Sequence, residues 1–144
     1  MLRFIGVVER VDVVEVEEEE IARVKIFDDF GDGLKMLDTF SHIIILYWFH
    51  LRDTDEERSV LRVIPRRHPG APEVGVFASR SPSRPNPIGL CVVELVKIEG
   101  NILLVKGLDA AEGSPVIDIK PYIPRADAFS EAVVPPWALR GPKT

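Results

Sequence analysis

Short apolar stretches separated by polar, glycine- and proline-containing segments recur along the whole chain, a pattern typical of β-strands joined by turns. Apolar and polar residues alternate over residues 21–27, "IARVKIF", and less regularly over the valine-rich residues 2–16. Both segments are predicted as strands. Residues 41–50, "SHIIILYWFH", contain a continuous apolar run instead, which predicts a strand buried on both faces.

The second half of the chain predicts further strands. Residues 59–67 and 74–80 are each expected to form a short strand. Residues 88–109 are expected to form a β-hairpin around the turn "EGN".

The segment "SPVIDIKPYIP", residues 114–124, is predicted as a strand that ends at a proline. Its alternation places Val116, Asp118 and Lys120 on one face and the two intervening isoleucines on the other.

Little helix is expected. Residues 28–40 combine turn-forming residues with a short helical patch, in which Leu34, Leu37 and Phe40 share one face, and residues 15–20, "EVEEEE", predict a loop. The predicted fold is therefore mainly β: a small single-domain β-barrel over residues 1–144 with one or two short helices, since closure removes exposed strand edges.

Composition narrows the setting. The chain has 144 residues, and no apolar run approaches the roughly 18 residues of a membrane span. The N-terminus turns acidic at once, so no signal peptide is predicted. Cys91 is the only cysteine, which indicates a reducing, cytoplasmic setting. One cysteine and three histidines scattered along the chain argue against a structural zinc site.

Charge is distributed unevenly along the chain. The net charge is −5, yet residues 58–84 contain six arginines and a single acidic residue. This basic segment indicates a local site for an anion such as a phosphate, a carboxylate or an RNA backbone. The alternative is a solvated arginine face that pairs with the acidic N-terminal third.

The basic segment ends in an unusual loop, "GVFASRSPSRPNPIGL", residues 75–90. Its prolines restrain the backbone, so little entropy is lost when a ligand binds. Arg80 and Arg84 offer planar forks for carboxylate or phosphate. We expect Arg84 to be exposed, so that its replacement by alanine costs less than about 0.5 kcal/mol. The alternative is a plain connector with exposed arginines.

Three other places hold candidate polar groups. His50 follows the strand at residues 41–50 and is expected to line a pocket at its end. Asp109 and Glu112 lie in a turn, where carboxylates hold ribose hydroxyls or an ammonium group or act as a base. Residues 118–122 alternate charged and aromatic groups, although a solvated edge strand explains them equally well.

Three blocks, "SHIIILYWFH", "GVFASRSPSRPNPIGL" and "DAAEGSPVIDIKPYIP", resemble the signature blocks of the TsaA/TrmO-like family. The resemblance implies a small dimeric β-barrel that binds S-adenosylmethionine (SAM) near the subunit boundary. It also implies methylation of N6 in a threonylcarbamoyl-modified adenosine beside the tRNA anticodon.

The resemblance assigns residues in this chain. The implied catalytic residues, which match the family's "DIKPY" block, are Asp118, Lys120 and Tyr122, with Asp118 as the expected base. The implied SAM-binding residues are His50, Leu51, Arg80, Arg84, Leu90, Asp109, Ala110, Ala111, Glu112, Gly113 and Ser114.

The sequence also departs from the family pattern. Residues 9–20 lack the "SP…PRQ"-like cofactor loop of bacterial members, and "EGSP" replaces the family's "DGTP" turn. Two alternatives therefore stay open: a SAM enzyme with a different acceptor, and a non-catalytic barrel that binds nucleotide or RNA.

Overall fold

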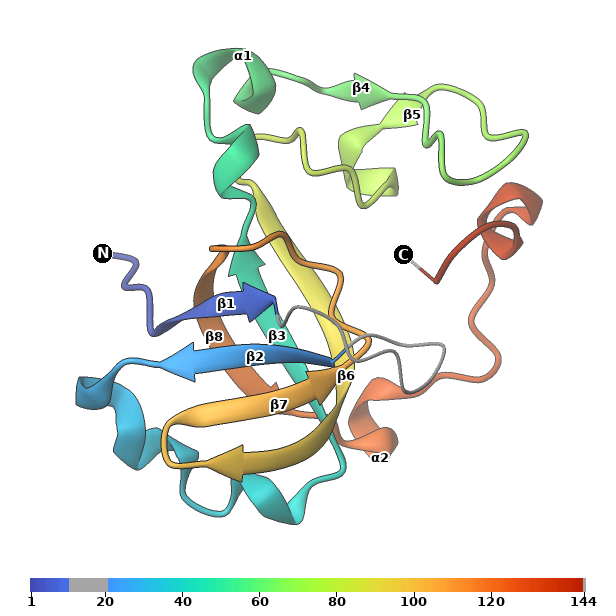
Figure 1. Ribbon diagram of the computed structural model, residues 1–144. Coiled ribbons are helices and arrows are strands. Elements are labelled where there is room, and N and C mark those ends of the chain that lie inside the picture. The colour runs from blue at the N-terminus through green and yellow to red at the C-terminus, as the bar shows by residue number, and fades with distance from the viewer. Residues whose placement is uncertain (11–20, 144) are drawn as a thin grey trace.

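Six strands in the described part of this computed structural model, residues 1–10 and 21–143, close into an antiparallel barrel in the order β1-β2-β7-β6-β3-β8 (Figure 1). The prediction of a mainly β barrel is confirmed. The strands are β1 (Gly6–Arg10), β2 (Ile21–Ile26), β3 (His42–Trp48), β6 (Ile88–Glu99), β7 (Ile102–Lys106) and β8 (Pro115–Pro121). Residues 11–16 of the predicted first strand and the predicted loop at 15–20 lie outside the described residues.

Strand β6 is the longest strand, and it changes partner along its length. Its first half pairs with β3, from Ile88 opposite Trp48 to Glu94 opposite His42. From Glu94 onward it pairs with β7 and forms the predicted hairpin, with a register shift between Leu95 and Lys97. The first half of β6 therefore has no β7 residues on its other edge.

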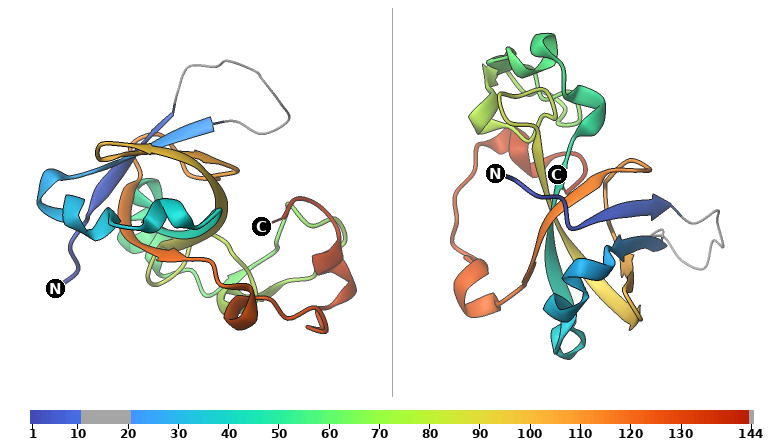
Figure 2. Two further views of the ribbon diagram at one scale, coloured as in Figure 1. Left: turned by 90° about the horizontal axis from the view of Figure 1, so that it is seen from below. Right: turned by 90° about the vertical axis from the view of Figure 1, so that its left-hand side faces the viewer.

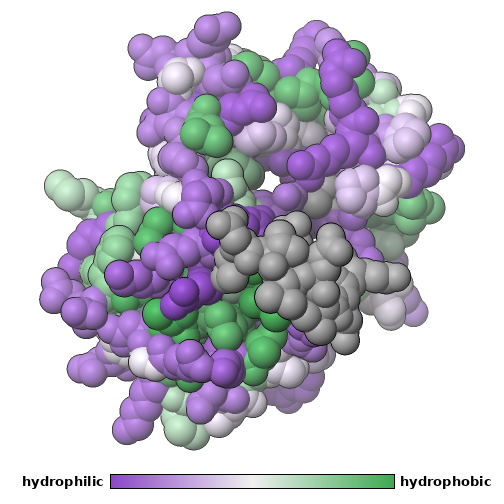
Figure 3. Space-filling model, viewed as in Figure 1, coloured by the Kyte–Doolittle hydropathy of each residue, from purple (hydrophilic) through white to green (hydrophobic). Residues whose placement is uncertain are grey.

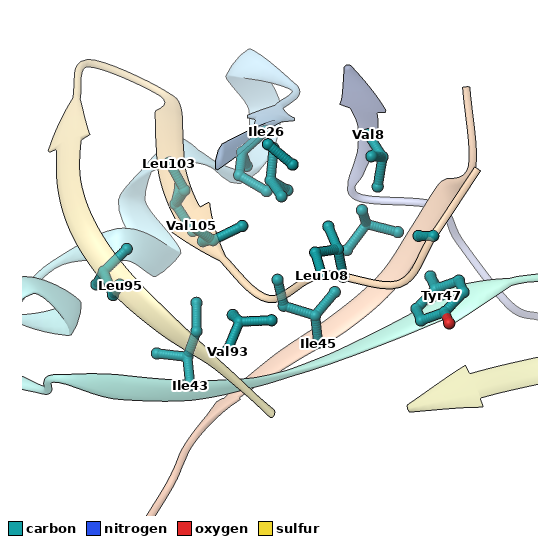
Figure 4. Packing of buried hydrophobic residues seen from close by; sticks show 14 residues of the cluster. Val8, Ile26, Ile43, Ile45, Tyr47, Val93, Leu95, Leu103, Val105 and Leu108 are labelled. Carbon is teal, nitrogen blue, oxygen red and sulfur yellow. The ribbon is translucent and has the colours of Figure 1, made fainter. Parts of the chain in front are cut away.

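Alternate side chains of the strands fill the barrel (Figure 4). Ile43, Ile45 and Leu103 are fully buried, and burial of each such side chain is worth about 1.5–3 kcal/mol. The prediction that β3 is buried on both faces is wrong, because its burial alternates and leaves Ile44 and Leu46 only half-buried on the outside. An antiparallel barrel has an outer surface, and the apolar run supplies both sides of its wall.

A β-bulge in β8 decides which of its residues point outward. Leu46 of β3 lies opposite Asp118, whereas the next residue, Tyr47, lies opposite Val116. The extra residue turns Val116 into the core, so the prediction that Val116 shares a face with Asp118 and Lys120 is wrong. The alternation of apolar and polar residues in the sequence does not reveal the bulge.

The chain between β3 and β6 forms an outer segment above the barrel (Figure 1). It contains α1 (Asp55–Arg58), the two-stranded pair of β4 (Arg62–Val63) and β5 (Val74–Gly75), and a 3₁₀ turn at Val76–Ala78. Only two residues of each predicted strand, 59–67 and 74–80, are therefore in strands.

The remaining helical turns are short. The predicted patch within residues 28–40 consists of 3₁₀ turns, Asp28–Leu34 and Leu37–Thr39. Leu34 and Leu37 pack against the core, but Phe40 does not share their environment and is exposed.

After β8 follow α2 (Pro124–Asp127) and a 3₁₀ turn at Pro136–Leu139. The C-terminal segment lies on the same side of the barrel as β4 and β5 (Figure 2). No helix among the described residues is long and apolar enough to cross a membrane.

We expect Gly89→Ala to destabilise the fold by about 1–3 kcal/mol, because overpacking forces neighbouring side chains to move. A Cβ at Gly89 would lie 2.6 Å from Cζ of Tyr47 and 2.8 Å from Cζ of Phe49. The matched control is Gly33→Ala, where a Cβ meets nothing within 4 Å. Urea denaturation of both variants tests this, and equal midpoints would contradict the prediction.

Candidate functional site

A cleft of about 2470 Å³ lies between the outer segment and the barrel. Figure 3 shows this region as a hollow in the surface. Its walls come from the end of β3, the proline-rich loop, the first half of β6 and the turn between β7 and β8. It opens where β6 has no β7 neighbour, so barrel topology creates the site.

Most of the SAM-binding residues implied by the resemblance meet in this cleft. The lining includes His50, Leu51, Arg80, Arg84, Leu90, Asp109, Ala110, Ala111 and Ser114. Glu112 and Gly113 belong to the same turn, and a Cβ at Gly113 would lie 3.9 Å from Nε2 of His50. Three segments far apart in sequence, residues 50–51, 80–90 and 109–114, thus supply one cavity.

The three implied catalytic residues are elsewhere. Asp118, Lys120 and Tyr122 do not line the cleft. Asp118 lies on the outer face of β8, 3.0 Å from Nζ of Lys120, and its Oδ1 accepts a hydrogen bond of 2.9 Å from the Ile119 N–H. Their catalytic role stays a prediction.

The outer face of the sheet nevertheless connects these residues to the cleft. Leu90 of β6 pairs with Leu46 of β3, which pairs in turn with Asp118 of β8. Neighbouring strands are about 4.8 Å apart, so Asp118 stands two strands away from a residue of the cleft wall.

The two arginines of the proline-rich loop have different surroundings. The Arg84 guanidinium donates hydrogen bonds of 3.0–3.1 Å to the carbonyl oxygens of Val76, Ser79 and Ser81. Arg84 is half-buried, so the expectation that it is exposed is wrong. Within the described residues, Arg80 makes no hydrogen bond or ion pair and is exposed beside the cleft. Arg80 is therefore the more available cation.

Serines of the same loop also hold its shape. The backbone N–H groups of Ser81 and Ser83 donate to the hydroxyls of Ser79 and Ser81, respectively. The buried Ser83 hydroxyl donates to Glu57, and this hydrogen bond is the main reason that the pKa of Glu57 lies below its usual value. Arg52 donates to Ser83 as well, at 3.0 Å. The loop is pinned to α1 rather than freely exposed.

Several cleft residues were missed by sequence reasoning. Nη1 of Arg67 lies 2.8 Å from Oδ2 of Asp109 and links the outer segment to the turn. The position of Arg67 within the basic segment, residues 58–84, could have identified it from the sequence. Tyr47 resembled a plain core residue, and no sequence pattern pointed to Pro142 and Lys143, which also line the cleft.

The C-terminal segment reaches the cleft through His68. Its Nδ1 donates to the Arg140 carbonyl at 2.6 Å, and its ring meets the edge of Trp137 with centroids 5.6 Å apart. Nη1 of Arg140 donates to the Pro69 carbonyl at 3.2 Å. These contacts explain why residues close to the C-terminus line the cavity.

Two groups at the barrel end of the cleft, Cys91 and Tyr47, have raised pKa values. Burial raises the pKa of the Cys91 thiol, which donates to the Gly107 carbonyl at 3.2 Å. Burial likewise raises the pKa of the Tyr47 phenol, which therefore stays protonated. Among the described residues, no group of three or more His, Cys, Asp or Glu side chains is placed to hold a metal ion.

Comparison with known proteins bears on this cleft. The family model described as the tRNA-methyltransferase O N-terminal domain matches residues 13–128. An S-adenosyl-L-methionine-binding protein from Archaeoglobus fulgidus is 49% identical over 114 residues, which cover 78% of this chain and 77% of that protein. A putative S-adenosylmethionine-dependent methyltransferase from Pseudomonas aeruginosa is 43% identical over 104 residues, which cover 72% of this chain and 42% of that protein.

Solved structures agree with the sequence comparison. TrmO from Pseudomonas aeruginosa superposes with a TM-score of 0.70 at 29% identity and covers 92% of this chain. Another TrmO structure gives a TM-score of 0.71 at 30% identity and covers 94%. The chain spans only 60% and 65% of these two proteins.

The contrast between the two loop arginines is directly testable. We expect Arg84→Ala to lose about 1.5–3 kcal/mol of stability, because a charged donor group is removed from three carbonyl oxygens. Arg80→Ala, the matched control in the same loop, is expected to change stability by less than about 0.5 kcal/mol. Urea denaturation and amide exchange over residues 79–86 measure both. Indistinguishable variants would show that the Arg84 hydrogen bonds do not hold the loop.

Proposed function

This chain belongs to the tRNA-methyltransferase O N-terminal domain family, and from that premise we propose that it binds SAM and methylates tRNA. The proposed acceptor is N6 of the threonylcarbamoyl-modified adenosine beside the anticodon. The relatives named as SAM-binding proteins support the cofactor, and the family description supports tRNA as the substrate.

The observation that carries the proposal is the combination of apolar, acidic and basic side chains that line the cleft. SAM combines a flat adenine, ribose hydroxyls, a sulfonium cation and an amino-acid carboxylate. Leu51 and Leu90 offer apolar surface, Asp109 an acceptor for hydroxyls, and Arg80 a guanidinium for a carboxylate. These residues fit the cofactor, which when bound supplies an activated methyl group.

The size of the cleft supports a second ligand group beside the cofactor. Its volume of about 2470 Å³ exceeds the roughly 300–1,000 Å³ typical of sites for one small molecule. Arg66, Arg67, Arg80 and Lys143 add positive charge to its lining. Such a rim suits the phosphates of an RNA strand or the threonyl carboxylate of the acceptor.

Alignment of donor and acceptor accounts for much of the expected rate enhancement. Holding two reacting groups in the right geometry is worth about 7–11 kcal/mol. The carbamoylated N6 nitrogen is a poor nucleophile, so we assign Asp118 to accept its proton.

We propose that Asp118 acts from a second subunit. The outer face of β6 exposes Ile88, Leu90 and Val92 at 42–48% of their surface, and this apolar face continues onto β3. A homodimer that buries this face brings Asp118 of the partner subunit toward the cleft, since Asp118 lies on the same face two strands away.

The first test is calorimetric titration with SAM and with its demethylated product, followed by mass analysis of tRNA nucleosides. We expect saturable binding of both and one added methyl group on threonylcarbamoyl-modified tRNA. An unmodified transcript of the same tRNA is the control and is expected to stay unmethylated.

Other outcomes separate the alternatives. A methyl group on another nucleoside or small molecule indicates a different acceptor. Binding without transfer under any condition indicates a non-catalytic barrel. A folded protein that binds neither compound contradicts the proposal.

Subunit complementation tests the position of Asp118. Neither Asp118→Asn nor Arg80→Ala chains are expected to methylate tRNA alone. Co-assembled chains should recover about a quarter of wild-type activity, since statistical mixing makes half of the dimers mixed and each of those has one intact site. No recovery, with native mass spectrometry showing mixed dimers, would place Asp118 in its own subunit's site.

A further inference from the structure

Two side chains from other strands hold the turn between β7 and β8. The Arg10 guanidinium donates to the Leu108 carbonyl at 2.6 Å and to the Ala110 carbonyl at 2.8 Å. The Tyr47 hydroxyl donates to the Asp109 carbonyl between them, also at 2.6 Å. Three consecutive carbonyl oxygens are therefore fixed by one residue of β1 and one of β3.

The Tyr47 ring is itself held rigidly. It is 4% exposed and meets the Phe49 ring edge-on, with centroids 5.3 Å apart. Gly89 provides the space for both rings, because any Cβ there would collide with them. The hydroxyl thus reaches the turn from a fixed point in the barrel wall.

The other side of the same turn is unsatisfied. Within the described part of the chain, the backbone N–H groups of Ala110 and Ala111 have no hydrogen-bond partner. Ala110 is only 4% exposed, and both residues line the cleft. A buried N–H without a partner costs about 1–3 kcal/mol, which applies to Ala110, whereas Ala111 is exposed and its N–H is open to solvent. Both donors are therefore available to an acceptor atom of a ligand, and the buried Ala110 N–H gains the most from one.

We propose that Tyr47 and Arg10 are positioning residues, which hold the turn so that the Ala110 and Ala111 N–H groups meet acceptor atoms of the nucleoside part of SAM. The assignment of this ligand rests on the proposed function. Both residues line the cleft, and in this proposal each acts through the backbone that it fixes rather than by contact with the ligand.

The test uses Tyr47→Phe in the full chain, because this change removes one oxygen atom and keeps the buried ring. We expect the dissociation constants of SAM and of its demethylated product to rise about three- to tenfold, the equivalent of one neutral hydrogen bond. In the protein without ligand, the amides of Gly113 and Ser114, which donate to the carbonyls of Val8 and Ala111, should exchange faster than in wild type.

The control is Ser59→Ala, which removes a hydroxyl that donates to the Asp55 carbonyl at 2.6 Å, away from the cleft. It should leave both the affinities and the exchange of the Gly113 and Ser114 amides unchanged. A lowered melting temperature with unchanged affinity and unchanged exchange in Tyr47→Phe would overturn the proposal, because a purely structural role gives that result.

The two proposals fail in different ways. If the wild-type protein binds neither compound, the proposed function and the ligand assignment are both overturned. Amide exchange in the free protein then still decides whether Tyr47 holds the turn. If the wild type binds and Tyr47→Phe binds equally well, only the positioning role is overturned.

Discussion

Hydrogen bonding along β6 changes partner at Glu94, and the cleft depends on that change. Before Glu94 the strand pairs with β3, and after it with β7, so the two neighbours share only the middle of the strand. The chain leaving β7 must cross open space to reach β8. It does so as the turn Asp109–Ser114, beside the edge of β6 that β7 leaves uncovered, and the cleft forms there.

The walls of this cleft are stiffened by hydrogen bonds that do not involve a ligand. Arg84 closes the proline-rich loop on itself, and Ser83 ties it to α1. Arg10 and Tyr47 fix the carbonyl side of the opposite turn. Groups such as Arg80 and the Ala110 N–H, which make no hydrogen bond to the described residues, are thus presented from rigid supports. Binding then costs little conformational entropy.

The family resemblance implies a catalytic role for Asp118, yet Asp118 does not line the cleft of its own subunit. The proposed dimer would account for both. Within one subunit the implied catalytic residues and the implied cofactor residues lie on different parts of the surface. They share an apolar outer face, which an isolated barrel leaves partly exposed at Leu90 and Val92. Burial of that face by a second copy would remove its apolar side chains from water and would also complete the site.

The sequence by itself determined the class of fold, the β6–β7 hairpin and the segments that carry the site, because alternation, turn residues and composition are local properties. Only the tertiary structure decided three other features. The bulge in β8 turned Val116 inward, the distant Asp109 carbonyl became the hydrogen-bond partner of the Tyr47 hydroxyl, and loop geometry separated Arg84 from Arg80. Each depends on which backbone groups the folded chain brings within hydrogen-bond reach, and that distance is not a property of any local pattern.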